Sequence, residues 1–264
     1  MYNNLENSEM MDCILSDKVI DMNDINEMNV VLNDNNCSDS FFSSICDYLE
    51  RDGVRFIATK NDSNLPTDNG IIITIDQQYS SGTNSLVFAP FSNTRFGFSD
   101  SFALAMRAGM LENGCQVASL IGGKVGYKVD EFGNISTLVP TSTEKIIDEN
   151  SDISFVTVSI GTQRVTPEMI AKSIESGLAR QKFFLDHYDV QTDLVYRANL
   201  GESVQDVSNY FGTTPEALIE YNHLPDKNVL NSQTIINPGV EEMEVFNPTI
   251  PYSLSKENIV HKSL

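Results

Sequence analysis

Carboxylates at strand ends or in pairs are the first residues in this chain that suggest chemistry. Asp76 follows the apolar run of residues 71–75, and the carboxyl end of a central strand is where α/β proteins place ligand contacts. The Asp-Glu pairs at 130–131 and 148–149 have the residue types of a general acid and base. Adjacency in sequence does not set the separation that such a pair needs. The sequence therefore assigns no catalytic residue to them.

Nucleophiles and metal ligands are also scarce. Ser159 and Cys115 have no histidine near them in sequence that could activate them. The chain has three histidines, which are far apart: His187, His223 and His261. It has four cysteines, which lack CxxC spacing: Cys13, Cys37, Cys46 and Cys115. We therefore expect reduced, partly buried thiols, and we expect no metal, no cofactor and no disulfide framework.

Alternating apolar strands and amphipathic helices must position any site in the first part of the chain. The expected strands are at residues 29–32, 54–58, 71–76, 86–89, 115–121 and 153–160. The expected helices are at residues 40–49, 99–113, 143–149 and 166–187, with a hairpin inserted within 122–138. Because the strands are mostly continuous apolar runs, the pattern predicts an α/β fold, in which a mostly parallel sheet carries helices on both faces.

Length and charge limit the possible classes of protein. The 264 residues, 41% of them hydrophobic, suffice for one α/β domain and one small module. The net charge of −20, from 37 acidic and 17 basic residues, opposes binding to nucleic acid or to a membrane surface. No apolar run approaches the roughly 20 residues that span a bilayer. The N-terminal segment lacks a basic region followed by an apolar one, so we expect no signal peptide and synthesis in the cytoplasm.

A strand, two helices and a second strand are expected between residues 194 and 238. Alternation of side chains at 195–198 predicts the first strand. Ser203 and Asp206 have the spacing of a capping box, in which each residue satisfies a backbone N–H at the start of a helix. The run Thr-Ile-Ile-Asn at 234–237, followed by proline, predicts the closing strand. The small C-terminal unit is therefore expected to have the order βααβ.

The two helices of this unit carry apolar residues at helical spacing. Val204, Val207, Tyr210 and Phe211 recur at helical spacing and are predicted on the inward face of the first helix, which Gly212 ends. Leu218 and Tyr221 are predicted to face that helix from the second one. The unit should therefore have a small core of its own.

This segment resembles a LysM module over essentially its whole length. The matching positions are Tyr196, Arg197, Gly201, Glu202, Ser203, Val204, the run 210–214, Leu218, Tyr221, Asn222, Leu230, Ser232, Gln233, Ile235 and Pro238. The sequence departs from the family pattern at 231–232, where a glycine commonly precedes the glutamine, and at 198–200, which replace a more basic lead into Gly201. The alternative is an amphipathic helical hairpin that binds no ligand.

The resemblance implies a glycan-binding groove between two loops, because LysM modules bind N-acetylglucosamine polymers such as peptidoglycan or chitin. By resemblance, one wall comprises Gly201, Glu202, Ser203 and Val204, and the other comprises Pro225, Asp226, Asn228, Val229 and Leu230. Neutral sugars need backbone amides and small polar groups for their hydroxyls and an apolar patch for the acetyl methyl, and these loops supply both. The alternative is that Val204 and Leu230 merely close the small core.

Residues 71–178 are similar in element order to the zinc-dependent N-acetylmuramoyl-L-alanine amidases. The similarity is carried by residues 73–76, 101–105, 114–117 and 158–160. It implies a first zinc histidine near Tyr79, a glutamate near residues 95–98 and a second histidine at Gly161, and none of these positions supplies that ligand. The resemblance therefore implies a degenerate domain without zinc or catalysis. An unrelated flavodoxin-like sheet is the alternative.

Four segments follow from these patterns: an acidic leader at 1–28 docked by one small helix, the α/β domain at 29–189, the LysM module at 194–238 and a tail at 239–264. The function expected is binding of an N-acetylglucosamine glycan in a cell-wall, spore or phage setting, with the α/β domain used for binding or assembly. One alternative is an active peptidoglycan hydrolase of the amidase class. Another is an assembly protein whose LysM fold contacts coat or virion proteins.

Overall fold

The structure is a computed structural model, and it describes most of the chain between Val19 and Ser255. The described residues are 19–60, 70–77, 84–88, 98–122, 127–129, 135–137, 154–161, 165–188, 194–199, 201–225, 229–230 and 233–255. The expected helix at 143–149 and the expected domain junction at 189–193 lie outside these ranges.

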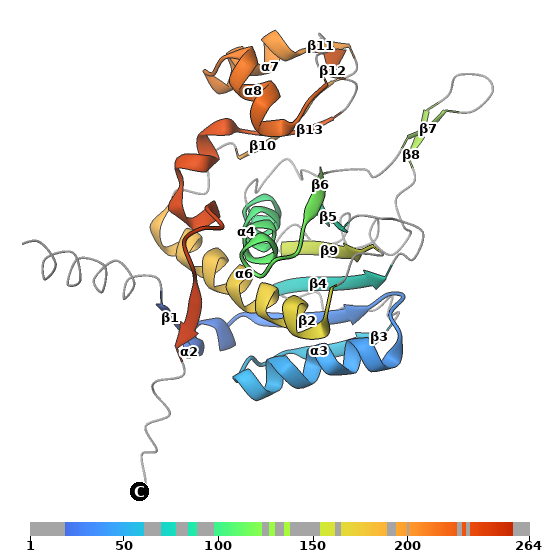
Figure 1. The fold of residues 1–264 in the computed structure, drawn as a ribbon, viewed down its shortest axis with the longest axis vertical. Helices are drawn as coiled ribbons and strands as arrows, with labels where there is room; N and C mark the ends of the chain where they lie inside the picture. The colour runs from blue at the N-terminus through green and yellow to red at the C-terminus, as the bar shows by residue number, and fades with distance from the viewer. Residues whose placement is uncertain are drawn as a thin grey trace, which may run out of the picture.

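A mixed, mostly parallel sheet of six strands forms the centre of the molecule, in the order β3-β2-β4-β9-β5-β6 (Figure 1). The strands are β2 (Asn29–Asp34), β3 (Ile57–Lys60), β4 (Gly70–Gln77), β5 (Asn84–Phe88), β6 (Val117–Gly122) and β9 (Ser154–Ile160). β3, β2, β4 and β9 are parallel, β5 runs antiparallel to β9, and β6 is parallel to β5. The predicted α/β fold with a mostly parallel sheet is confirmed. Between β6 and β9 the chain forms the expected hairpin, which consists of β7 (Tyr127–Val129) and β8 (Ile135–Thr137).

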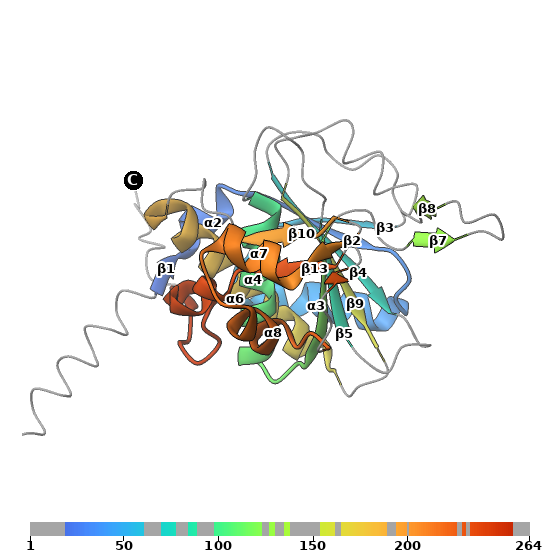
Figure 2. The ribbon, with the colours of Figure 1, turned by 90° about the horizontal axis from the view of Figure 1, so that it is seen from above.

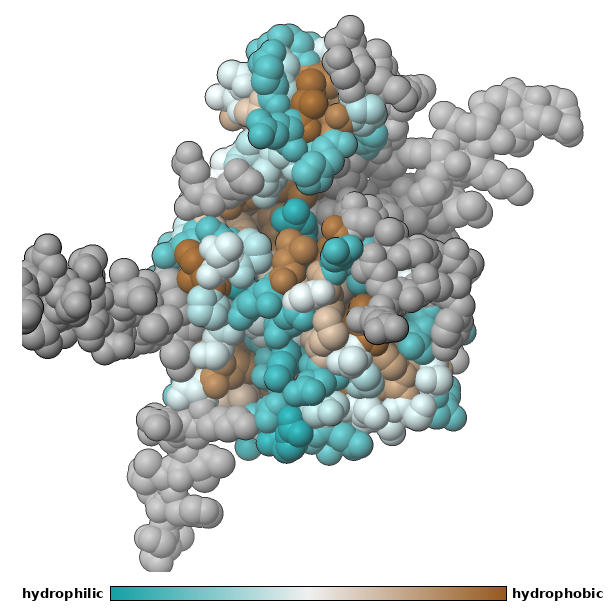
Figure 3. Space-filling model, in the orientation of Figure 1, coloured by the Kyte–Doolittle hydropathy of each residue, from teal (hydrophilic) through white to brown (hydrophobic). Residues whose placement is uncertain are grey.

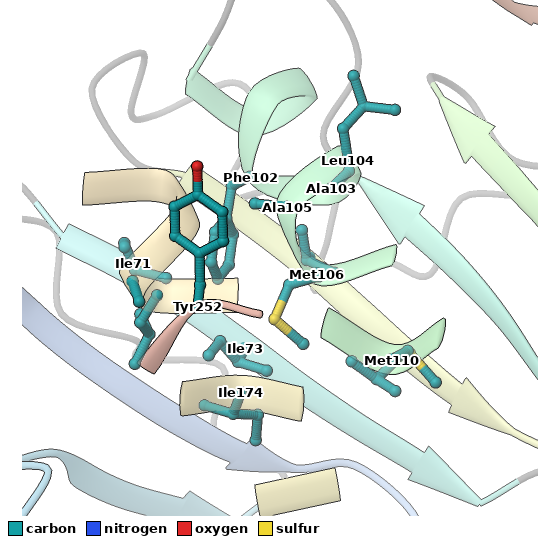
Figure 4. Close-up of a cluster of buried hydrophobic side chains, with 14 of the residues drawn as sticks. Ile71, Ile73, Phe102, Ala103, Leu104, Ala105, Met106, Met110, Ile174 and Tyr252 are labelled. Atoms are coloured by element: carbon teal, nitrogen blue, oxygen red, sulfur yellow. The ribbon is translucent and has the colours of Figure 1, made fainter. Parts of the chain in front are cut away.

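Three helices, α3 (Asp39–Asp52), α4 (Phe98–Glu112) and α6 (Pro167–His187), pack on one face of this sheet. Alternate residues of β4, among them Ile71 and Ile73, point toward them, together with Phe102, Met106 and Ile174 (Figure 4). Helix α6 begins where predicted, because the Thr166 side chain accepts a hydrogen bond from the Met169 amide at 3.2 Å. None of the described helices is long and apolar enough to cross a membrane.

The opposite face of the sheet is covered as well. Val31 and Ile72 point away from the three helices and are only 3% and 1% exposed. Apolar strands that are buried on both faces explain why the sequence shows continuous rather than alternating hydrophobic runs. Because α3, α4 and α6 all lie on one side, coverage of this second face by helices stays a prediction.

Glycines allow α4 and α6 to approach closely. A Cβ atom built on Gly109 of α4 would lie 2.6 Å from the Ser173 carbonyl oxygen of α6. A Cβ atom built on Gly177 of α6 would collide with the Met106 sulfur of α4. Since real side chains do not tolerate such distances, both positions favour glycine where α4 and α6 pack together.

Part of the predicted leader belongs to the core. Strand β1 (Val19–Asp21) pairs in parallel with β14 (Ser253–Ser255), at the far end of the described chain. The expected docking helix is α2 (Met22–Asn26), which buries Met22 and Ile25 in the large hydrophobic cluster. Residues 19–28 therefore form a packed segment rather than a solvated one.

Part of the predicted tail is also buried. After two short 3₁₀ helices, η1 (Pro238–Glu242) and η2 (Glu244–Phe246), the chain runs along α6 to β14. Val245, Phe246 and Tyr252 of this returning segment, which we define as residues 238–255, are each at most 5% exposed. The tail as predicted from the sequence therefore begins within the core of the α/β domain.

A buried arginine fixes the returning segment. The guanidinium of Arg180 on α6 is fully buried and donates hydrogen bonds to three backbone oxygens, those of Val245 at 2.7 Å, Asn247 at 3.1 Å and Ile250 at 2.6 Å. It also donates to the Glu112 carboxylate of α4 at 2.7 Å, and its central carbon lies 4.5 Å from the Tyr252 ring centre. One side chain thus links α6, α4 and the returning segment.

Replacing this arginine should weaken the whole α/β domain. We expect Arg180→Met to lower the free energy of unfolding by about 3–5 kcal/mol, because Glu112 loses its ion-pair partner and the three backbone carbonyls lose their donor. Lys182→Met is the control, because its ion pair with Asp186 lies at the surface of the same helix and is worth at most about 1 kcal/mol. Urea unfolding measures both variants. Equal losses in the two would show that Arg180 does not hold the segment.

Candidate functional site

The carboxyl edge of the sheet was the first candidate site. Two of its described polar side chains accept hydrogen bonds from backbone amides of a loop there. Asp34, with its side chain 3% exposed, accepts a hydrogen bond from the Cys37 amide at 2.8 Å. The Gln77 side-chain oxygen accepts one from the Ser38 amide at 3.0 Å. β4 and β9 bring the candidates Asp76 and Ser159 side by side. This pairing places a carboxylate beside a hydroxyl.

A histidine that could activate Ser159 is not found there among the described residues. His187 stacks on Phe183 with ring centres 4.0 Å apart, and its Nδ1 lies 2.9 Å from the Phe183 carbonyl oxygen. His223 ends a helix of the βααβ unit. In the part of the chain that the structure describes, no cluster of His, Cys, Asp and Glu side chains is arranged to hold a metal ion.

The three cysteines that the structure describes, Cys37, Cys46 and Cys115, are poor nucleophiles in their environments. Burial, reinforced by the Asp34 carboxylate, raises the pKa of Cys37 to about 12. Burial, with Glu50 nearby, raises the pKa of Cys46 to about 11. Burial also raises the pKa of Cys115, which is 1% exposed. Because the thiolate is the reactive form, these cysteines are suited to packing rather than to catalysis.

The positions that the amidase resemblance assigned to zinc ligands divide into two groups. Gly161 is described, has no side chain, and donates its backbone N–H to the Asn84 side-chain oxygen at 3.0 Å. Tyr79 and residues 95–97 lie outside the described part of the chain. The structure therefore tests only one of these positions, and that one holds a structural hydrogen bond.

The C-terminal unit has the predicted order of elements. Strand β10 (Val195–Arg197), helices α7 (Val204–Phe211) and α8 (Pro215–Asn222), and strand β13 (Thr234–Ile236) follow one another. β10 and β13 pair antiparallel. The Ser203–Asp206 capping box is present, and Gly212 ends α7 in the left-handed conformation. The helix-start and helix-end signals predicted from the sequence are therefore present in the structure.

A small core closes the unit. It contains Ala198, Val204, Val207, Leu218, Leu230 and Ile235. Val204 and Leu230, predicted as groove residues, are 4% and 1% exposed, so their side chains are occupied by this core. A ligand would meet these two residues through their backbone.

One asparagine joins α8 to the closing strand. The Asn222 side chain donates to the Ile236 carbonyl at 2.8 Å and accepts from the Ile236 amide at 2.7 Å. It also donates to the Leu218 carbonyl at 3.1 Å within its own helix. This side chain therefore fixes the position of α8 against β13.

The two predicted groove walls meet. Strand β11 (Glu202–Ser203) pairs antiparallel with β12 (Val229–Leu230), so that Glu202 lies opposite Leu230 and Ser203 opposite Val229. Gly201, at the entrance of this ladder, is exposed, has a φ of +85°, and has no atom within 4 Å of the place where a Cβ would lie. Pro225 is exposed on the other side, and Asp226 and Asn228 lie outside the described residues.

Glu202 is the charged centre of this region. Its carboxylate accepts hydrogen bonds from the Tyr196 hydroxyl at 2.9 and 3.1 Å and from the Asn199 amide at 2.7 Å. Burial and this hydrogen bond to the carboxylate raise the pKa of Tyr196 to about 12. Hydrogen bonds from Ser203 lower the pKa of the nearby Asp206. The Asp206 carboxylate is therefore held in the charged form at neutral pH.

Three aromatic rings lie beside these carboxylates. The Tyr196 ring centre is 4.8 Å from that of Tyr210 and 6.1 Å from that of Phe211. Tyr210 is 55% exposed, so the prediction that it faces inward was wrong. We call Tyr196, Tyr210 and Phe211 the aromatic platform. Helical spacing alone did not reveal it, although a tyrosine next to phenylalanine on so short a helix was a signal that one ring must face outward.

The unit is attached to the α/β domain by apolar contacts. Leu194, Val195 and Ile236 belong to the large core rather than to the small one, and Tyr221 packs against the large core instead of α7 as predicted. Seen from above, α7 and α8 overlie α4 and α6 (Figure 2). On the face drawn in Figure 3, apolar areas are small and separated by hydrophilic residues. The candidate site is thus presented on a fixed support.

Comparisons with known proteins give only remote similarities. No protein-family model and no curated protein sequence matches the chain. The structure is similar to the catalytic domain of CwlV, an N-acetylmuramoyl-L-alanine amidase from Bacillus (Paenibacillus) polymyxa var. colistinus, with a TM-score of 0.35 and 14% identity over 60% of this chain and 99% of that one. It is also similar to an N-acetylmuramoyl-L-alanine amidase from Clostridium difficile 630, with a TM-score of 0.35 and 8% identity over 61% and 99%. At these TM-scores the similarity carries no inference about function.

Removing the asparagine contact should loosen β13. We expect Asn222→Ala to reduce the hydrogen-exchange protection of the Ile236 amide by about tenfold to a hundredfold, because the loss of these partners costs about 1–3 kcal/mol. Asn209→Ala is the matched control, since the Asn209 side chain accepts a hydrogen bond from the Gln205 side chain on the exposed surface of α7. Exchange measured by NMR distinguishes the two. An unchanged Ile236 amide in Asn222→Ala would contradict this role.

Proposed function

We propose that the chain binds a glycan built from N-acetylglucosamine, of the peptidoglycan or chitin type, at the loops 201–204 and 225–230 of the C-terminal unit. The β11–β12 pairing carries the proposal, because it brings together the two segments that the LysM resemblance assigns to one groove. Exposed Gly201 and Pro225 border that pair. The groove would be formed by backbone groups and small side chains rather than by Val204 and Leu230.

The physical character of this region suits a neutral sugar. Hydroxyl and acetamide groups are recognised by backbone amides, carbonyls and small polar side chains, which the loop entering α7 supplies. Each net hydrogen bond contributes only about 0.5–1.5 kcal/mol, so a single unit should bind weakly. Several copies on one polymer would raise the apparent affinity through effective concentration.

The α/β domain, in this proposal, supports the binding unit or takes part in assembly. The described polar groups at the carboxyl edge of its sheet hold loops, and its described thiols are partly or fully buried. The alternatives are distinguishable by experiment. Release of stem peptides from purified sacculi would favour a peptidoglycan hydrolase, and co-purification with coat or virion proteins that chitooligosaccharide does not disturb would favour an assembly role.

Two glycine variants test the binding loop. We expect Gly201→Ala to weaken binding of an N-acetylglucosamine hexamer, because a φ of +85° is strained for alanine and the loop must move. Gly212→Ala is the control, because Gly212 also has a positive φ, of +67°, and also has nothing within 4 Å, but it ends α7 away from the loop. Both should lose about 1–2 kcal/mol of stability.

NMR titration of the full chain with the hexamer provides the measurement. Shifts at residues 201–204 and 225–230 that are reduced in Gly201→Ala and retained in Gly212→Ala would support the proposal. The absence of shifts at millimolar hexamer would refute it, and so would equal weakening by the two variants.

A further inference from the structure

The aromatic platform has an accessible ring beside a negative charge. Tyr210 is 55% exposed, and the Tyr196 ring that it contacts donates its hydroxyl hydrogen bond directly to Glu202. Exposed tyrosine faces stack on sugar rings and attract cations, because the face of the ring is electron-rich. The platform thus offers an apolar face and a carboxylate to the same ligand.

The carboxylates near the platform are not neutralised by a described cation. Among the ion pairs of the described residues, none includes Glu202 or Asp206. Their hydrogen bonds come instead from hydroxyl and amide donors of Tyr196, Asn199 and Ser203. An ammonium group placed at the edge of the platform would therefore meet carboxylates that form no ion pair with the cations whose side chains the structure describes.

The net charge of the whole chain also favours a ligand that carries ammonium groups. With a net charge of −20, the protein attracts cationic polymers, is indifferent to neutral ones and repels anionic ones. Peptidoglycan carries carboxylates on its peptides, so a fully N-acetylated wall polymer offers this protein no electrostatic attraction. A glycan from which acetyl groups have been removed carries free amino groups. Once these are protonated, the acidic protein attracts the polymer.

We propose that the platform and Glu202 recognise a partly de-N-acetylated glycan, in which a glucosamine ring stacks on Tyr210 and its C2 ammonium pairs with Glu202. This inference rests on the proposed glycan-binding function and specifies its ligand. Glu202 belongs both to the predicted groove and to the platform, so one sugar chain would contact both. The ammonium replaces the acetamide as the group that is recognised at this position.

Direct comparison of two oligosaccharides tests the ligand class. The full chain is titrated with a glucosamine hexamer and with an N-acetylglucosamine hexamer at low ionic strength and at a pH where the amines are protonated. We expect the glucosamine hexamer to bind about tenfold more tightly, which is the size of one favourable ammonium–ring and ammonium–carboxylate contact. The preference should decrease with added salt and disappear at a pH where the amines are neutral.

Variants with matched controls locate the contact. Tyr210→Ser should remove most of the preference, whereas Ile57→Ser, which removes an apolar side chain that is 57% exposed on β3, should not change it. Glu202→Gln keeps an oxygen that accepts the Tyr196 and Asn199 hydrogen bonds and should also remove the preference. Glu216→Gln makes the same change of charge on α8 and should retain it.

The outcomes separate this inference from the proposed function. Equal binding of the two hexamers, or a preference that survives in Tyr210→Ser, overturns the inference while loop shifts with the N-acetylated hexamer would still support the proposed function. A preference for the glucosamine hexamer that is lost in Tyr210→Ser supports the inference, and the absence of loop shifts with the N-acetylated hexamer refutes the proposed function on which the inference rests. Displacement of the glucosamine hexamer by lysine hexamer at equal concentration would show that charge alone is recognised, and it would overturn the inference.

Discussion

The buried guanidinium of Arg180 is the interaction on which the arrangement of the other parts depends. The returning segment has little regular secondary structure, so its carbonyl groups need donors from elsewhere once they are buried. Arginine suits this role, because its planar group carries five donors in fixed directions. Burial lowers the pKa of Arg180, whereas the Glu112 carboxylate favours its charged form. Without this cation the segment would have to expose those carbonyls to water, and β14 could not lie beside β1.

Through the returning segment the same interaction fixes the βααβ unit. The chain enters the βααβ unit after α6 and returns to the α/β domain at η1. Leu194 and Val240, which lie at these two connections, are buried in the large core. Figure 1 shows the unit beyond the edge of the sheet that β6 forms, next to α4 and the C-terminal end of α6. The loops that form the candidate site therefore have a fixed direction relative to the α/β domain, which distinguishes them from loops on a module joined by a flexible linker.

The sequence predicted what depends on neighbours along the chain. The Ser203–Asp206 capping box links residues three apart, and β4 follows from an uninterrupted apolar run, so both were recognisable. Sequence spacing could not predict that Arg180 would bond to oxygens 65 to 70 residues away, because a mid-helix arginine is normally exposed. The outward ring of Tyr210 and the β11–β12 ladder likewise depend on how the elements pack, not on local propensity.

The pairing of β1 with β14 makes the βααβ unit an insertion in the α/β domain rather than an appendage. During synthesis, β14 and the segment that contacts Arg180 emerge after the unit does. The unit, whose helices and strands lie within one short stretch, has mostly local contacts and can form early. The α/β core, in contrast, remains open along α6 until residues 245–255 have left the ribosome. The βααβ unit is therefore expected to be folded on a nascent chain whose α/β domain is still incomplete.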